Sequence, residues 1–444
     1  MRHFLESGAL LRVISAYDTT LVFPPADWAR LCNSPDVSRW GVPARRIAIP
    51  NVRRDLFNQL FFIDQARPRL DREWREIRSG WLSMIGRKAA LKYSLMSLPL
   101  VSAFAMKVIR GKLAAVPAIE LHSLINEIRP DILIHPSIFK GYFINDLSEI
   151  AKQRAIPFIL LMNSWDNPSL KRAALGSPDA VAVWGEQTAR HSHKFMRIPR
   201  ERIHVLGAAQ FQLYRDPPDH DRGEVCVSNG IDPAKPIILY AGSSKGNREH
   251  FHLQRLNDAI ADGTLPAASI LYRPHPFGVS VDEARRIIEV ELPHVVVEHS
   301  MRNLLLAIAE ERHKGFFITP YADTHDLLSA VDIVISPLST ILIEAALHGK
   351  PALCFVPEEE DKNSIWKSLR QLVHFQELMH SPGLMLAQSH AEFLPAVQRL
   401  FTWVADPAQA RRIRAEMEYF VQFPQIRYDQ AVLDLANSLL ARWT

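Results

Sequence analysis

One segment, residues 332–351, narrows the possible folds of this chain more than any other. It reads DIVISPLSTILIEAALHGKP. Its first five residues form an apolar run of strand length, Pro337 interrupts the run, and the apolar spacing of ILIEAAL is that of a helix ending near Gly349. We therefore predict a buried strand, a turn and a helix, which is the repeating unit of an open parallel α/β sheet.

The turn in this segment has the composition of a phosphate site. Ser336 ends the strand, and Ser339 and Thr340 begin the helix, where free N–H groups, hydroxyls and the positive end of the helix dipole attract anions. Glu344 follows a little over one turn later, where its carboxylate could accept hydrogen bonds from ribose hydroxyls. The alternative is that Ser339 merely caps the helix and Glu344 is solvated, and the segment alone does not separate the two.

Two other apolar strands are also followed by residues that suit phosphate. Residues 269–272 lead into RPHP, in which Arg273 offers a planar fork for phosphate and His275 can donate a hydrogen bond or a proton. Residues 237–241 lead into a small polar loop, a weak signal alone because it lacks the spacing of a P-loop. Open parallel sheets bind ligands at the carboxyl ends of their strands, so the three strand ends together predict one anion site. The loop residues assigned to it are Gly242, Ser243 and Ser244.

The length of 444 residues and the alternation of short apolar runs with helical spacing predict two α/β domains. We expect an N-terminal domain at 1–215, a Pro-, Asp- and Gly-rich linker at 216–236, and a second domain at 237–420. A C-terminal helix at 421–444 is expected to pack back on the first domain. Strands are expected at residues 20–23, 132–135, 158–162, 180–184, 204–206, 237–241, 269–272, 295–298, 316–319, 332–335 and 352–356, and the clearest helices of the first half at 116–128 and 144–154.

The charge of the chain is unevenly distributed. The net charge is +4, but residues 39–112 contain 16 Lys and Arg against 5 Asp and Glu, a local balance of +11 that leaves −7 for the rest. Large aromatic residues lie among these cations, a combination that can seat a protein on an anionic membrane surface or hold an anionic acceptor. A helical region with solvated arginines is the alternative. No nucleic-acid recognition motif accompanies the charge, so nucleic acid is not an expected partner.

The remaining polar patterns predict neither a metal site nor a cofactor. The three cysteines are far apart and no secretory signal pattern is visible, which indicates the cytoplasm, with a peripheral position on the inner face of the cytoplasmic membrane as a further option. The Asp-x-Asp at 219–221 is expected to be a solvated turn, His191 and His193 to be surface residues, and the acidic run 358–361 to be solvated. A proline and several polar residues interrupt the apolar stretch 89–109, so a spanning helix is not predicted.

The order of these motifs resembles that of a known enzyme class. RPHP followed by DTHDLLSAVDIVISPLSTILIEAALHGKP is similar to the donor half of bacterial surface-polysaccharide glycosyltransferases and of CDP-glycerol glycerophosphotransferases. NSWDN at 163–167 resembles part of their first domain. The chain therefore looks like a glycosyltransferase of the GT-B type, with two Rossmann-like domains, a cleft between them and C-terminal helices. The resemblance covers residues 130–357 and implies a reaction with no obligatory metal.

The resemblance also implies roles for individual residues. Ser339, Thr340 and Glu344 match the positions that hold diphosphate and ribose, and Arg273 and His275 match the pair that faces the donor phosphates. Relatives that transfer polyol phosphates tend to have Asp where this chain has Glu344. That difference favours a sugar nucleotide as the donor.

Asp166 is the candidate catalytic base. It follows the strand expected at 158–162, at the carboxyl edge of the first sheet, and Trp165 beside it could stack on a sugar or exclude water. The alternative is that Asp166 and Asn167 cap the next helix. We expect a glycosyltransferase that moves a sugar from a nucleotide donor to a surface glycan or lipid-linked acceptor. The alternatives are a CDP-glycerol-type polyol-phosphate transferase, a UDP-sugar 2-epimerase-like enzyme, and a GT-B binding subunit without activity.

Overall fold

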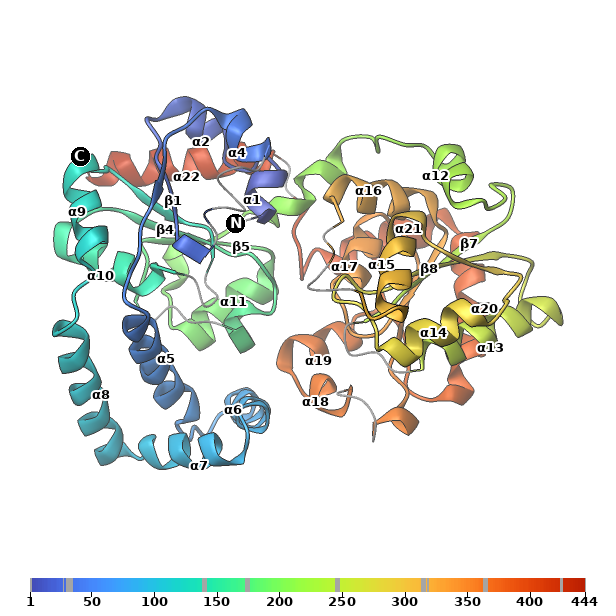
Figure 1. Ribbon diagram of the computed structural model, residues 1–444, viewed down its shortest axis with the longest axis horizontal. Helices are drawn as coiled ribbons and strands as arrows, with labels where there is room; N and C mark the ends of the chain where they lie inside the picture. Colours follow the sequence, from blue (N-terminus) through green and yellow to red (C-terminus); the bar gives the residue numbers. More distant parts are fainter. Residues whose placement is uncertain are drawn as a thin grey trace. The chain divides into compact units, whose positions relative to one another are not determined.

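The computed structural model divides into two compact units, each built on a parallel sheet (Figure 1). The first unit comprises Met1–Gln212, Leu372–His374 and Phe420–Thr444, and the second comprises Leu213–Gln371 and Phe375–Tyr419. The structure describes residues 2–26, 28, 35–137, 142–171, 176–243, 248–312, 317, 319–361, 366–423 and 426–443.

The central sheet of the first unit has the strand order β3-β4-β5-β6, all parallel. The sequences FILL of β4 and AVAV of β5 are buried along their whole length, which is expected of strands covered on both faces. One face packs against α22 at the C-terminus and the two short helices at the N-terminus, in a core that includes Phe4, Val13 and Val432. The strands are β3 (Leu133–His135), β4 (Phe158–Leu161), β5 (Ala180–Val183) and β6 (Ile203–Val205), and the helices α1 (Arg2–Glu6), α2 (Leu11–Ala16), α9 (Ile119–Ile128), α10 (Ile144–Arg154), α11 (Glu186–Met196) and α22 (Tyr428–Trp443).

A helical arm, residues 51–114, is inserted ahead of this sheet and extends away from it (Figure 1). Its four helices enclose a small core of their own, in which Leu60 and Ile63 pack with Trp81 and Ile109. The arm follows a short parallel pair of strands. These elements are β1 (Leu21–Phe23), α4 (Pro35–Trp40), β2 (Ala44–Arg46), α5 (Asn51–Ala66), α6 (Arg72–Met84), α7 (Arg87–Met96) and α8 (Pro99–Ala114).

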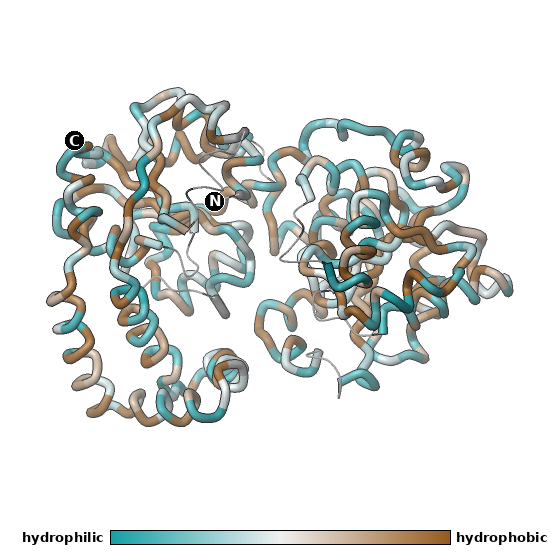
Figure 2. The backbone as a smooth tube through the Cα atoms, viewed as in Figure 1, coloured by the Kyte–Doolittle hydropathy of each residue, from teal (hydrophilic) through white to brown (hydrophobic). Residues whose placement is uncertain are grey.

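The outer surface of the arm is apolar as well as basic. Figure 2 shows hydrophobic residues along α7 and α8, interrupted by hydrophilic ones. No single helix among the described residues is long and apolar enough to cross a membrane. The pair α7 and α8 meets that length and composition only when taken together, and it is bent by 98° between the two helices.

The second unit contains a six-stranded parallel sheet in the order β12-β11-β10-β7-β8-β9. From β7 the chain moves outward to β9, returns to β10 beside β7, and then moves outward on the other side. The strands are β7 (Ile237–Ala241), β8 (Ser269–Arg273), β9 (Val295–Val297), β10 (Ile333–Ser336), β11 (Ala352–Phe355) and β12 (Met385–Ala387). The helices are α12 (Arg222–Asn229), α13 (Glu249–Ala261), α14 (Val281–Glu289), α15 (His299–Ala309), α16 (Tyr321–Ala330), α17 (Ile341–Leu347), α18 (Trp366–Arg370), α20 (His390–Val404) and α21 (Pro407–Met417).

The remaining described elements of the chain are short. They are the helical turns η1 (Asn167–Lys171), η2 (Arg200–Arg202), η3 (Ala209–Arg215) and η4 (Glu358–Glu360), and the helix α19 (Val373–Met379).

The predicted pair of parallel α/β units is confirmed, since strands form at ten of the eleven predicted places. The eleventh, at 316–319, falls partly outside the described residues. Two strands were not predicted, β2 and β12. The segment expected to be a linker, 216–236, contains the helix α12. Asp221 and Glu224 form a capping box at the N-terminus of this helix. That helix packs against α16 and belongs to the second unit.

Candidate functional site

The strand order of the second sheet reverses between β7 and β10, and this position defines the candidate site. Open α/β sheets bind ligands outside the carboxyl ends of their strands at such a switch point. The register places Ile335 beside Tyr240, and Ala241 beside Arg273. The segments after β7, β8 and β10, which the sequence analysis assigned to one anion site, therefore start at neighbouring points on the same edge.

Arg273 is the last residue of β8 and is buried. Its Nη2 donates to the hydroxyl of Thr324, 3.1 Å away, and its Nε lies 3.8 Å from Glu298. Its Nη1 is buried and has no hydrogen-bond partner among the described residues. A buried donor without a hydrogen bond costs free energy, so this nitrogen is suited to a ligand that accepts a hydrogen bond from it.

The turn after β10 differs in detail from the prediction. The side chain of Ser339 does not cap the helix. The residue before α17 is Thr340, in a right-handed helical conformation and without a side-chain cap. The helix is also short, at seven residues. Ser336 is fully buried at the end of β10, and its hydroxyl has no partner among the described residues.

Glu344 is held by a residue that the sequence analysis did not single out. The hydroxyl of Tyr214 donates to its carboxylate over 2.5 Å. Burial, with the charge of Glu344 beside it, raises the pKa of Tyr214 well above its usual value, so the phenol stays protonated as the donor. The Tyr214 ring stacks on His325 at 5.0 Å and meets His348 edge-on at 4.5 Å. This packing fixes the direction of the Glu344 carboxylate.

The charge of Arg273 also acts on Tyr214, because it opposes the increase in the pKa of the phenol. Arg273 ends β8 and Glu344 lies on the helix that follows β10, so both belong to the same edge of the second sheet. This placement follows from the switch-point topology and not from sequence distance.

His275 lies half-buried after β8. Burial lowers the pKa of its imidazole from 6.5 to about 4, so the ring is neutral near pH 7. Its Nδ1 accepts a hydrogen bond from the backbone N–H of Phe277 at 3.1 Å, which leaves the ring proton on Nε2. His275 is therefore a hydrogen-bond donor without a positive charge.

The loop after β7 is held by an internal carboxylate. Ser243 donates its backbone N–H to Glu249 over 2.9 Å, and Tyr272 donates its hydroxyl to the same carboxylate over 2.6 Å. Gly242 has no room for a side chain, since a Cβ there would lie 2.4 Å from a Glu249 oxygen. Ser244 lies outside the described residues.

In the first unit, Asp166 is buried in a turn after β4. Its carboxylate accepts from the Ser164 hydroxyl at 2.7 Å and from the Asn167 amide at 3.1 Å. Trp165 is fully buried, with its ring edge-on to His374 and Phe420 at 5.1 and 6.0 Å. The Trp165 ring is therefore packed in the core of the first unit. This corrects the expectation that it could stack on a sugar.

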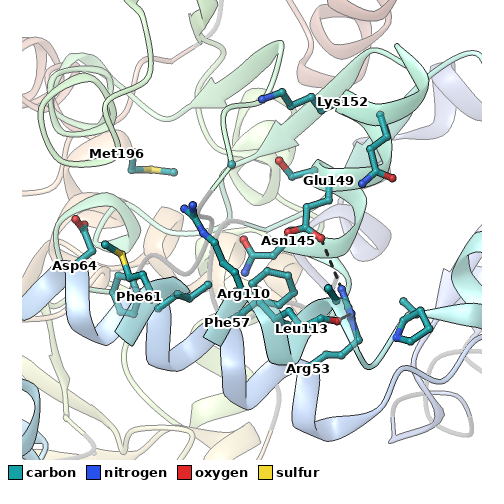
Figure 3. Close-up of a pocket in the computed structure, with 18 of the residues that line it drawn as sticks. Arg53, Phe57, Phe61, Asp64, Arg110, Leu113, Asn145, Glu149, Lys152 and Met196 are labelled. Atoms are coloured by element: carbon teal, nitrogen blue, oxygen red, sulfur yellow. Dashed lines mark hydrogen bonds and ion pairs between the residues drawn. The ribbon is translucent and has the colours of Figure 1, made fainter. Parts of the chain in front are cut away.

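A pocket of about 910 Å³ opens between the helical arm and α10 of the first unit (Figure 3). Arg53 lines one side of the pocket and donates hydrogen bonds to Asp146 and to the carbonyl oxygens of Leu113 and Val116. Arg110 projects into the pocket and Lys152 stands at its rim (Figure 3). The other lining cations are Arg67 and Arg197, the carboxylates are Asp64 and Glu149, and the apolar lining includes Phe57, Leu60, Phe61 and Met106. The pocket therefore combines positive charge with apolar walls.

Two other sequence expectations are corrected. His191 is fully buried, because α11 turns one face inward at a spacing of three to four residues, and Phe195 packs on its ring at 5.1 Å. Within the acidic run 358–361, the side chain of Glu360 is 1% exposed and bonded to His252. The turn η4 directs this third glutamate inward, away from solvent.

The chain is similar to known proteins in part of its sequence and in its fold. No family model matches the chain. A UDP-N-acetylglucosamine–N-acetylmuramyl-(pentapeptide) pyrophosphoryl-undecaprenol N-acetylglucosamine transferase of Nocardioides sp. (strain ATCC BAA-499 / JS614) is 27% identical over 243 residues. These residues are 53% of this chain and 55% of that protein, so the chain spans about half the length of the curated relative that it matches.

Among solved structures, the fold matches that of a UDP-GlcNAc 2-epimerase from Neisseria meningitidis bound to UDP-GlcNAc. The match covers 98% of this chain and 97% of the epimerase chain. The TM-score is 0.52 and the identity 12%. A match to the wall teichoic acid polymerase TagF covers 70% of this chain and 89% of the TagF chain, with a TM-score of 0.41 and 11% identity. The near-complete overlap with the epimerase shows the fold, two Rossmann-like units of the GT-B type, as the sequence predicted.

Proposed function

We propose that this chain is a glycosyltransferase that moves a sugar from a nucleotide-activated donor to a lipid-linked or glycan acceptor. The observation that carries the proposal is the switch-point edge of the second sheet. There, Arg273 Nη1 and Ser336 Oγ are buried, polar and without a partner among the described residues, on the two strands that flank β7. The similarity to a UDP-N-acetylglucosamine–N-acetylmuramyl-(pentapeptide) pyrophosphoryl-undecaprenol N-acetylglucosamine transferase supports the same class of donor.

The donor groups have the chemistry that a departing diphosphate needs. Arg273 supplies a fixed positive charge, and charge-assisted hydrogen bonds to phosphate are about twice as strong as neutral ones. His275 adds a neutral Nε2–H donor. Glu344, oriented by Tyr214, is the proposed acceptor for a ribose hydroxyl. The further donor contacts that we propose are Gly242, Ser243, Ser244, Ser339 and Thr340.

On the acceptor side we propose the pocket of the first unit and Asp166. An acceptor with a phosphate or diphosphate beside a hydrocarbon chain would match Arg110 and Lys152 together with the apolar wall. Asp166 is the proposed base for the acceptor hydroxyl, a role worth about 10²–10⁴ in rate. The serine and amide hydrogen bonds to its carboxylate hold it in one orientation.

We also propose that the helical arm rests on an anionic membrane surface. Leu91, Leu95, Leu100 and Phe104 are exposed large apolar residues on α7 and α8, the last at 70%. Exposed cations lie among them, namely Arg87, Lys88, Lys92, Lys107 and Lys112. Apolar side chains interleaved with cations favour binding to anionic lipid headgroups. An acceptor carried by a lipid would then reach the protein at the surface where the arm binds.

A transfer assay tests the proposal. The full chain is incubated with radiolabelled UDP-N-acetylglucosamine and a polyprenyl-diphosphate sugar in detergent micelles, and labelled lipid is extracted. We expect acceptor-dependent product with the wild-type chain and a large loss with Arg273→Ala. A panel of UDP, GDP, CDP and TDP in thermal-shift assays shows which nucleotide the second unit prefers, because a ligand bound only by the folded state raises the melting temperature.

The same assays separate the alternatives. If the chain converts the nucleotide sugar into its 2-epimer without any acceptor, the assignment as a transferase is replaced by that of a 2-epimerase. Turnover of CDP-glycerol instead of sugar nucleotides would make the chain a polyol-phosphate transferase. Nucleotide binding with no turnover of any donor would leave a binding subunit.

A further inference from the structure

Three side chains in the second unit form a compact cluster apart from the groups assigned to the donor. They are His252 on α13, Glu360 on η4 and His390 at the start of α20. One ligand atom from each lies within 4.8 Å of the others. His252 Nε2 is 2.9 Å from Glu360 Oε1, and His390 Nε2 is 3.3 Å from the same oxygen. Two imidazoles therefore converge on one carboxylate.

The cluster is buried and incompletely satisfied. The side chains of His252 and Glu360 are 5% and 1% exposed, and that of His390 is 21% exposed. Glu360 Oε2 has no hydrogen-bond partner among the described residues, and neither ring nitrogen of His390 has a hydrogen bond of good geometry there. In the described part of the chain, the ion-pair partners of Glu360 are these two histidines. A buried carboxylate without a full positive counterpart is costly.

The ring of His252 is held in one orientation by its neighbours. The Tyr240 hydroxyl lies 2.7 Å from His252 Nδ1, and Phe355 packs edge-on to the ring at 4.7 Å. These contacts direct Nε2 toward Glu360. A second hydrogen bond that fixes the ring in this way is usual for histidines that ligate metals.

We propose that His252, Glu360 and His390 bind one divalent transition-metal cation of the zinc class through two imidazole nitrogens and a carboxylate oxygen. In a tetrahedral site with bonds near 2.0–2.1 Å, neighbouring ligand atoms are about 3.3 Å apart. The separations of 2.9 and 3.3 Å fit that geometry with small adjustments. Two imidazole ligands favour a transition metal over magnesium and calcium, which prefer oxygen ligands. A water molecule would complete the coordination.

The cation would be structural, since it would join three segments that each follow a different strand. The helix α13 follows β7, η4 follows β11, and α20 follows β12. Binding would fix the first turn of α13, whose Glu249 holds the backbone of Ser243. The proposal does not depend on the transferase assignment, and it departs from the expectation of no metal that the sequence alone gave.

The test is a metal titration of the full chain without an affinity tag, after treatment with EDTA and its removal. Calorimetry with Zn²⁺ and the visible absorption of Co²⁺ report affinity, stoichiometry and nitrogen coordination. We expect one ion per chain, and at least 100-fold weaker binding in His390→Ala and Glu360→Gln. His380→Ala is the matched control, because His380 is exposed in the same unit and bonded only to the Gln376 carbonyl among the contacts described, and it should bind as the wild type does.

His390→Ala carries the most weight, since His390 is the most exposed of the three and its loss leaves the buried pair in place. Circular dichroism confirms that each variant is folded. The proposal is overturned if the wild-type chain shows no saturable binding of either ion. It is equally overturned if folded His390→Ala and Glu360→Gln bind with the wild-type affinity, because the ion would then lie elsewhere.

Discussion

Glu249 beneath the loop after β7 is expected to make the second unit less stable as pH rises. The side chain is almost fully buried, and burial raises the pKa of its carboxyl from 4.5 to about 7, against the hydrogen bonds from Tyr272 and Ser243 that lower it. The nearby carboxylates of Glu283 and Glu360 add to the increase. The folded chain therefore keeps a proton that the unfolded chain releases above pH 4.5.

The sign and size of the effect follow from this difference. A raised carboxyl pKa favours the unfolded state as pH rises, so stability is lost from about pH 4.5 to about pH 7 and levels off above. Between pH 5 and pH 8 the contribution of Glu249 to the free energy of unfolding falls by about 2.5 kcal/mol, at 1.36 kcal/mol per pH unit. Glu249→Gln keeps an acceptor for Ser243 but cannot ionise, so it lacks this loss.

Urea unfolding of the wild-type chain and Glu249→Gln at pH 5, 6, 7 and 8, in buffer with EDTA, measures the difference. The wild type should lose stability relative to the variant across this range. Glu289→Gln, which changes an exposed carboxylate on α14, should follow the wild-type curve. Parallel curves for the wild type and Glu249→Gln would refute the reasoning, because they would show that the folded chain ionises Glu249 as easily as the unfolded one.

Four further changes test the proposed site. Arg273→Ala should lower kcat/KM for the sugar nucleotide by about 10²–10³, as expected for removing a donor to a developing negative charge, and an unchanged value would exclude it from the donor site. Asp166→Asn should lower kcat by about 10²–10⁴ while the donor Kd stays constant, and near-normal turnover would exclude it as the base. Arg110→Glu should raise KM for a diphosphate-bearing acceptor and leave the donor Kd unchanged, whereas Arg399→Glu on the exposed side of α20 should leave both unchanged. Phe104→Glu should weaken binding to vesicles containing phosphatidylglycerol about tenfold or more, since burying a phenylalanine contributes about 1.5–3 kcal/mol, and undiminished cosedimentation would contradict the membrane contact.

The sheets could be predicted because their strands are short, wholly apolar runs. FILL, AVAV and IILYA are buried from end to end, so local composition alone locates them. The strands β2 and β12 were missed for two different reasons. ARR in β2 is largely exposed and charged, and the apolar run around MLA in β12 fits a buried helix segment as well as a strand. Their pairing depends on neighbours distant in sequence.

The candidate site was predictable in its outline but not in its supports. The parallel topology places Arg273 near the turn after β10, and the sequence implies that topology. Tyr214 could not be found in this way, because it lies next to the segment read as a linker and meets Glu344 across 130 positions of sequence. Glu360 was missed because two neighbouring glutamates suggest a solvated run, and only the backbone turn of η4 separates the buried one from the rest.

Arg53 ties both ends of the helical arm to one place. It stands in the first turn of α5, and it binds the carbonyl oxygen of Leu113 at the end of α8 and the carboxylate of Asp146 on α10. The arm is held a second time at α6, because Glu73 forms ion pairs with Lys194 and Arg190 on α11 and Trp74 packs edge-on to Phe195. Two anchor points fix the direction of the arm, so substitutions in the pocket can alter what the first unit recognises without moving the helices that carry them.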